Sequence, residues 1–154
     1  MVWGAVSYEG KLPLKFVEEG SKINTAYYQN EILDNFLKNN ADLLYPDGDW
    51  TFQQDSAPAH KANSTQKWLE ENCPRFINQN EWPSSSPDLN PLDYCVWGIL
   101  ENRVNSFSHK SIESLKRKLV MEWDNFPMET IRASIESWRS RLSKVAEKNG
   151  GRFE

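Results

Sequence analysis

The sequence has few cysteines and no long apolar run, and these shortages exclude several classes of protein. Its two cysteines, Cys73 and Cys95, form no CxxC pair and no cluster with histidine. Neither a disulfide scaffold nor a zinc site is therefore indicated. No apolar stretch approaches the ~20 residues of a membrane span, and no basic segment followed by an apolar block stands after Met1. We expect a soluble protein that is not secreted, with free thiols in a reducing compartment.

The composition also argues against disorder, because the chain is rich in aromatic residues. It contains seven Trp, seven Phe and five Tyr among 154 residues, enough to bury the core of one domain. The charge is uneven: residues 1–100 carry 7 Lys and Arg against 14 Asp and Glu, whereas residues 101–154 carry 11 against 8. The acidic first part argues against a broad nucleic-acid-binding surface, but it suits a carboxylate-lined metal site.

Short runs of aromatic and β-branched residues predict strands in the first part of the chain. Residues 3–7 and 12–17 flank a glutamate–glycine turn signal and predict a hairpin. Residues 50–55 follow a turn-forming segment and alternate aromatic with polar side chains, so a third strand is predicted to end at Asp55. Residues 75–82 are a weaker strand candidate.

Apolar residues at helical spacing predict the remaining elements. The predicted helices run from Asn24 or Thr25 to Asn39-Asn40, from about 62 to 72, from Asn90-Pro91 to about 104, from about Ile112 to Trp123, and from Met128 to Gly150-Gly151. Strands that alternate with helices predict an α/β fold, in which helices flank a mixed sheet.

Two aspartates stand where metal-dependent chemistry would need them. Asp55 ends the third predicted strand, and Asp93 lies in the first turn of the helix that begins at Asn90-Pro91. A strand end and a helix start can aim two carboxylates into one cleft. Hard divalent cations take such oxygen ligands, and a pair of cations supports phosphoryl transfer. Structural interpretations also fit: Asp55 suits an Asx turn before Pro58, and Asp93 suits helix capping.

Other polar residues have simpler interpretations. His60 stands near a helix start, where a single histidine is more often a solvent-exposed structural residue than a ligand or an acid-base group. Asp88 is most simply a loop residue. The basic residues of the last helix suit either contacts with DNA phosphates or, more simply, a solvated face opposite the apolar stripe. These basic residues are Arg132, Arg139, Arg141, Lys144 and Lys148.

Two long segments resemble the carboxylate motifs of a known family. Residues 50–60, WTFQQDSAPAH, and residues 81–100, EWPSSSPDLNPLDYCVWGIL, are similar to the second and third catalytic motifs of the mariner superfamily of cut-and-paste transposases. Residues 1–20 resemble the hairpin that precedes these motifs in the family, and residues 141–154 resemble its usual ending. The resemblance covers essentially the whole chain in collinear order.

This resemblance implies an RNase H-like catalytic domain with two of three metal-binding carboxylates. Asp55 matches the second catalytic carboxylate and Asp93 the third, with 37 residues between them. Asp at the third position is typical of the mariner side, whereas the segment SPDLNP is similar to relatives that use Glu. The spacing is somewhat longer than the commonest one in mariner transposases, so we assign a mariner-like side branch. The helix after Asp93 resembles the packing helix below the site, and its expected core residues are Trp97, Ile99 and Leu100.

In the family, the first catalytic Asp lies on the first, central strand, upstream of the segment that begins here. Four other aspartates fall in a predicted helix or turn and do not replace it: Asp34, Asp42, Asp47 and Asp49. The expected organisation is a partial RNase H-like core over residues 1–105, without its central strand, and additional C-terminal helices over residues 106–154 that pack on the core.

The resemblance implies an endonuclease and strand transferase that acts on DNA phosphodiesters with Mg²⁺ or Mn²⁺. Transposon ends and target DNA are the implied partners, and the nucleus is the implied location, with no membrane and no small-molecule substrate. Without the first Asp and its strand, we expect this chain alone to bind metal weakly, to leave strand edges that a homodimer would cover, and not to cut DNA. The alternative is a catalytically inactive, transposon-derived protein that acts by binding DNA or protein.

Overall fold

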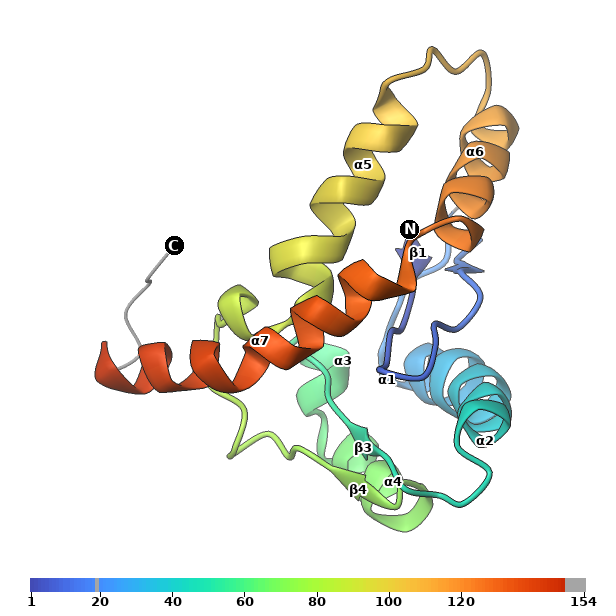
Figure 1. Cartoon of the computed structure of the whole chain (residues 1–154). Helices are drawn as coiled ribbons and strands as arrows, with labels where there is room; N and C mark the ends of the chain where they lie inside the picture. Colours follow the sequence, from blue (N-terminus) through green and yellow to red (C-terminus); the bar gives the residue numbers. More distant parts are fainter. Residues whose placement is uncertain (19, 149–154) are drawn as a thin grey trace. The chain divides into compact units, whose positions relative to one another are not determined.

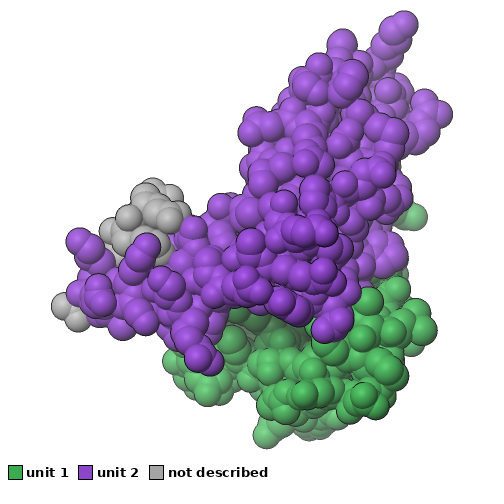
Figure 2. All heavy atoms as spheres, in the orientation of Figure 1, with its two compact units in different colours: residues 1, 16–86 green, residues 2–15, 87–154 purple. Residues whose placement is uncertain are grey.

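The computed structural model describes residues 1–18 and 20–148, which form two compact units (Figures 1 and 2). Of the described residues, unit 1 comprises Met1, 16–18 and 20–86, and unit 2 comprises Val2–Lys15 and 87–148. Strands and helices both occur, as expected for an α/β protein. Among the described residues, no helix combines the length and the apolar character that crossing a membrane requires.

The predicted hairpin at the start of the chain is confirmed. β1 (Val2–Trp3) pairs with β2 (Lys15–Phe16) in a two-stranded sheet. At the turn, the backbone N–H of Ser7 donates to the carbonyl of Gly10 at 2.7 Å, which closes a four-residue loop. Both strands are shorter than the sequence pattern suggests, since only two residues of each join the ladder.

The second sheet lies within unit 1 and is parallel. β3 (Thr51–Phe52) pairs with β4 (Arg75–Phe76), and the N–H of Ile77 donates to the carbonyl of Phe52 at 2.9 Å. The strand that was expected to reach Asp55 therefore ends three residues earlier, because the chain turns at Asp55 instead of continuing the ladder. Within the described residues, the strands form two separate pairs rather than one mixed sheet.

The first helices of unit 1 form one long segment. The sequence predicted where this segment starts, but the predicted end came too early. Its parts are α1 (Thr25–Tyr27), η1 (Tyr28–Lys38), which is a π-helix, and α2 (Asn39–Leu44). The side chain of Asn24 accepts from the N–H of Tyr27 at 2.9 Å and so caps the start, as predicted. The predicted stop at Asn39-Asn40 is wrong. Both asparagine side chains donate to carbonyls one turn back, at 3.0 and 2.7 Å, so neither breaks the helix.

Two helices follow β3 in unit 1. The sequence predicted α4 (Asn63–Asn72) but missed the short α3 (Pro58–Lys61) that precedes it. A proline at the first helical position needs no N–H partner and has the backbone angle a helix requires, which explains where α3 starts. α4 ends as expected: Cys73 has an extended backbone, which the following Pro74 imposes.

Unit 2 is built mainly from helices, in which α5 and α6 run side by side (Figure 1). Its elements are η2 (Pro87–Leu89), η3 (Leu92–Val96), α5 (Trp97–Asn105), α6 (Ile112–Asp124) and α7 (Met128–Glu147). The side chain of Asn90 accepts from the N–H of Leu92 at 3.2 Å, which confirms the predicted helix start. The predicted end of the last helix, at Gly150-Gly151, lies outside the described residues.

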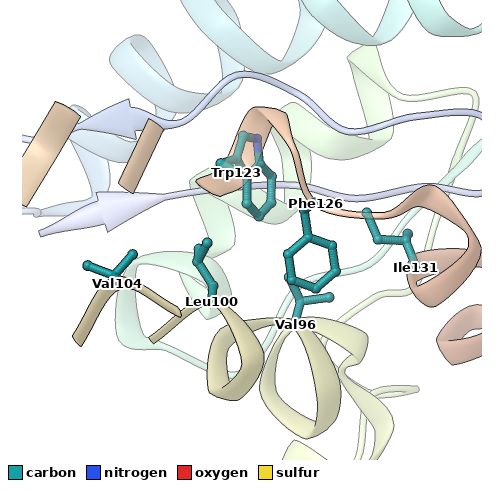
Figure 3. Close-up of a cluster of buried hydrophobic side chains, with 6 residues drawn as sticks. All are labelled: Val96, Leu100, Val104, Trp123, Phe126 and Ile131. Atoms are coloured by element: carbon teal, nitrogen blue, oxygen red, sulfur yellow. The ribbon is translucent and has the colours of Figure 1, made fainter. Parts of the chain in front are cut away.

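The core of unit 2 joins the last three helices and the segment before them (Figure 3). Its fully or nearly fully buried residues are Val96, Leu100, Val104, Trp123, Phe126 and Ile131. Trp97 and Ile99 pack against this cluster and are partly buried. The expectation that Trp97, Ile99 and Leu100 belong to the core is therefore confirmed, with Leu100 completely enclosed.

Replacing Gly4 with alanine should destabilise the protein, because the hairpin backbone comes very close to the core there. A methyl group at Gly4 would lie 3.0 Å from Cη2 of Trp97 and 3.1 Å from Cδ2 of Leu14. Overpacking of this kind costs about 1–3 kcal/mol of the free energy of unfolding. Chemical denaturation followed by circular dichroism measures the loss.

Gly98 provides a matched control for this substitution. It lies in α5, and a methyl group there would meet nothing within 4 Å. Because glycine inside a helix is less stable than alanine by roughly 0.5–1 kcal/mol, Gly98→Ala should raise the free energy of unfolding. Equal stabilities for the two variants would contradict the close packing described at Gly4.

Candidate functional site

Asp55 lies in the loop after β3 and has two oxygens in different environments. Its Oδ1 accepts two hydrogen bonds, from the backbone N–H of Ala57 at 2.9 Å and from Nδ1 of His60 at 2.6 Å. The side chain is 53% exposed. The hydrogen bond from His60 is the main cause that lowers the pKa of the Asp55 carboxyl, and burial opposes it. The carboxylate is therefore ionised at neutral pH and open to solvent.

The loop that carries Asp55 is anchored through Gln54 and His60. The hydroxyl of Tyr28 donates to Oε1 of Gln54 at 2.6 Å, and Nε2 of Gln54 donates to the carbonyl of His60 at 3.2 Å. Gln66 of α4 donates to the same carbonyl at 2.9 Å. Because Tyr28 is buried in η1, these bonds connect the loop to the interior of unit 1.

The Asx turn suggested for Asp55 is present, whereas the interpretation of His60 as a solvent-exposed residue is wrong. Its side chain is only 18% exposed, and its ring packs on Tyr28 with the centroids 4.2 Å apart. The short α3 brings His60 back to Asp55. A signal for this was in the sequence: a proline three residues after Asp55 can start a helical turn that returns a residue five positions on.

Asp93 lies in the first turn of η3 in unit 2, on the side exposed to solvent. Its backbone N–H donates to the carbonyl of Asn90 at 2.9 Å, so the helix start fixes its position. The preceding η2 is held by α7, because Nε1 of Trp138 donates to the carbonyl of Leu89 at 2.9 Å. Asp93 therefore lies shortly after η2, which a hydrogen bond holds against α7.

The residue after Asp93 adds two further contacts with α7. The hydroxyl of Tyr94 donates to the carbonyl of Ser134 at 2.6 Å. The guanidinium of Arg141 lies 3.8 Å from the centroid of the Tyr94 ring and donates to the carbonyl of Asp88 at 3.3 Å. A cation is attracted to the face of an aromatic ring, so Arg141 contacts the chain both before Asp93, at Asp88, and after it, at Tyr94.

Arg141 and a second of the five basic candidates make contacts within their own unit. Besides Arg141, Arg132 donates to the carbonyl of Tyr8 at 3.0 Å and lies over the Tyr8 ring. The remaining three, Arg139, Lys144 and Lys148, are exposed. The surface that suits phosphate contacts is therefore narrower than the sequence implied, with Arg141 acting as a support for the loop.

Carboxylate oxygens are the metal ligands that this arrangement offers. Asp55 belongs to unit 1 and Asp93 to unit 2, so their convergence on one ion remains a prediction. Among residues 1–18 and 20–148, no three His, Cys, Asp or Glu side chains gather as a metal cluster. Thiolate ligation is unfavourable at Cys73, because burial raises the pKa of its thiol to about 12. The chemistry points to hard cations such as Mg²⁺ or Mn²⁺.

Comparison with known sequences finds similarity to transposases. No protein-family model matches the chain. The Tc3 transposase of Caenorhabditis elegans is 34% identical over 97% of the chain, and the Tcb1 transposase of Caenorhabditis briggsae is 31% identical over 97%. Over nearly its whole length the chain is therefore similar to transposases of the Tc1 and mariner kind. It spans about half the length of these relatives, 44% of the Tc3 and 52% of the Tcb1 transposase.

Solved structures of the mariner transposase Mos1 have the same fold as this chain. The Mos1 paired-end complex with the left transposon end matches 99% of the chain with a TM-score of 0.83 at 25% identity, and the chain covers 44% of Mos1. The crystal structure of the isolated Mos1 catalytic domain matches 99% with a TM-score of 0.79 at 24% identity, and 74% of that domain is covered. The Mos1 catalytic domain has also been solved with Mn and with Mg.

Proposed function

We propose that this chain forms part of the catalytic domain of a DNA transposase, an endonuclease and strand transferase that acts on phosphodiesters. The observation that carries the proposal is Asp55, an ionised carboxylate with an exposed side chain, in a chain collinear with Tc1 and mariner transposases. Its expected partner in the site is Asp93. Both side chains stand on supported segments, as ligands of a catalytic metal must.

Mg²⁺ or Mn²⁺ is the proposed cofactor, with Asp55 and Asp93 as its ligands. Both residues supply oxygens, which Mg²⁺ prefers, and Mg²⁺ needs only one or two protein carboxylates beside water and phosphate. Divalent cations at such a site activate the attacking oxygen and stabilise the leaving one. The Mos1 structures with Mn and Mg support this choice of metal.

The proposal includes a third carboxylate and a central strand from outside residues 1–154. It is supported by the strands of the described residues, which pair two by two, and by relatives about twice as long as the chain. We also propose the division into a core, residues 1–105, and C-terminal helices, residues 106–154. A completed site would explain how two carboxylates serve a reaction that needs ligands around two ions.

DNA is the proposed partner, as transposon end and as target, and the nucleus the proposed location. The exposed side chains of Arg139, Lys144 and Lys148 provide positive charge for phosphates. Mos1 transposase forms a paired-end complex with the left transposon end, which supports the same kind of partner here. A homodimer is the proposed assembly, because pairing of two copies would cover open strand edges.

The shared metal site can be tested by iron-mediated cleavage of the chain. Fe²⁺ replaces Mg²⁺ at oxygen-rich sites, and with ascorbate and peroxide it releases radicals that cut the nearby backbone. We expect two sets of fragments, with ends near Asp55 and near Asp93, measured by mass spectrometry. Excess Mg²⁺ and the variant Asp55→Ala should each suppress both sets.

Cleavage near only one of the two aspartates would overturn the shared site. Suppression of one set but not the other in Asp55→Ala would mean two independent metal sites, which also contradicts the proposal. The chain without Fe²⁺ but with ascorbate and peroxide is the control for random oxidation.

A further inference from the structure

The carboxylate of Asp55 is held by one oxygen only. Both of its hydrogen bonds within the described residues, from Ala57 and from His60, end on Oδ1. A carboxylate can accept about four hydrogen bonds, two on each oxygen. Oδ1 is thus saturated by two donors, whereas the side chain as a whole remains 53% exposed. Oδ2 accepts no hydrogen bond from the described residues, so it is the oxygen that is available to a further ligand.

The second donor, His60, is itself firmly placed. Its ring packs against Tyr28, which is 1% exposed, with an angle of 35° between the two ring planes, and its backbone carbonyl accepts from Gln54 and Gln66. These partners come from η1, from the β3 loop and from α4, all within unit 1. Since a carboxylate only accepts, Nδ1 of His60 carries the proton of the bond to Asp55. The imidazole therefore acts as a fixed donor whose direction the interior of the unit determines.

We propose that His60 is a positioning residue that fixes the rotation of the Asp55 carboxylate, so that Oδ2 alone faces the metal as a one-oxygen ligand. This inference rests on the proposed function, because it assumes that Asp55 binds the metal. The N–H of Ala57 restrains Oδ1 from one direction, and the bond from His60 adds a second direction that further restricts rotation about the Cβ–Cγ bond. Mg²⁺ demands near-ideal octahedral geometry, so a ligand that turns would be penalised strongly.

An ordinary surface ion pair would not explain this arrangement. Pairs of exposed charges contribute little to stability, and the packing of the His60 ring against Tyr28 does not depend on the bond to Asp55. Groups that orient a metal ligand, in contrast, commonly change metal affinity about 10–100-fold when they are removed. The two roles of the imidazole, ring packing and hydrogen-bond donation, can therefore be separated by substitution.

Two variants of the chain make this separation. His60→Phe keeps an aromatic ring against Tyr28 but removes the donor. His60→Asn removes the ring but keeps a donor, because Nδ2 of asparagine is as many bonds from the backbone as Nδ1 of histidine. Mn²⁺ affinity is measured by calorimetry at pH 7 and thermal stability by circular dichroism, with wild type and Asp55→Ala in parallel.

We expect His60→Phe to bind Mn²⁺ about 10–100-fold more weakly while retaining most of its thermal stability. His60→Asn should bind within a few-fold of wild type in spite of a lower melting temperature. A positioning role predicts that His60→Phe is the more stable variant but binds Mn²⁺ more weakly than His60→Asn. If His60 were only structural, the more stable variant would also bind Mn²⁺ more tightly.

Wild-type affinity in His60→Phe, together with lost affinity in Asp55→Ala, would overturn the inference and leave the proposed function standing. Affinity that follows melting temperature across both His60 variants would also overturn it. Unchanged affinity in Asp55→Ala would instead remove Asp55 from the metal site, and with it both the proposed function and this inference.

Discussion

The affinity of the chain for Mn²⁺ should fall by more than about tenfold when Asp55 is replaced with alanine, and by a similar factor in Asp93→Ala. Loss of a group that merely orients a ligand costs about 10–100-fold, and loss of the ligand itself should cost at least as much. The double variant should be little weaker than either single one, because both changes disrupt one site. Isothermal titration calorimetry at pH 7 measures all four proteins.

Asp34→Ala is the control for charge in this experiment. Asp34 is an exposed aspartate of η1, one of those that the sequence excluded from the site, so its loss removes the same charge from elsewhere. If Asp34→Ala lowered the affinity for Mn²⁺ as much as Asp55→Ala does, the affinity would depend only on the net charge of the chain. Losses in Asp55→Ala and Asp93→Ala that add fully in the double variant would show two separate ions.

Replacing Trp123 with alanine should reduce the free energy of unfolding by about 3–5 kcal/mol. Trp123 is 1% exposed, stacks on Trp97 with ring centroids 5.8 Å apart, and donates from Nε1 to the carbonyl of Leu12 at 2.8 Å. Alanine would leave a cavity among the helices of unit 2 and a buried carbonyl without its donor. Denaturation by guanidinium chloride, followed by far-UV circular dichroism, measures the change.

Trp123→Phe separates the cavity from the hydrogen bond. Phenylalanine fills most of the space and keeps an aromatic face toward Trp97, but it leaves the carbonyl of Leu12 unpaired, which costs about 1–3 kcal/mol. The Phe variant should therefore be clearly more stable than the Ala variant. Equal losses in the two variants would mean that the hydrogen bond, rather than the packing of the indole, dominates this part of the core.

Helical periodicity predicted which residues share a face, but not whether another element covers that face. In α7, Ile131 is completely buried, whereas Leu142 of the same stripe is 39% exposed. In α6, Trp123 is buried but Ile112 is 56% exposed. Spacing records local geometry, and coverage depends on partners distant in sequence, which for α7 include η2 and η3. The position and type of these helices could therefore be predicted, while the extent of the core could not.

The same limit explains what was missed around Asp55. The position of Asp55 after a strand could be predicted from the sequence, because turn-forming residues and alternating aromatic and polar residues are local signals. The contact with His60 depends on α3, a helix of four residues that carries too little periodicity to be recognised. The stacking of His60 on Tyr28 joins residues 32 positions apart, and no pattern within either segment specifies it.

The close packing around Gly4 limits which substitutions related sequences can accumulate at this position. Because the backbone of Gly4 lies against the indole of Trp97 and the side chain of Leu14, a larger residue does not fit at position 4 while both side chains stay in place. A larger residue at position 4 is easier to accommodate after the indole has been replaced by a smaller side chain and the end of Leu14 has shifted, so the order of the substitutions matters. Substitution histories at positions 4 and 97 should therefore be correlated among descendants of this gene, with the smaller side chain at 97 arising first.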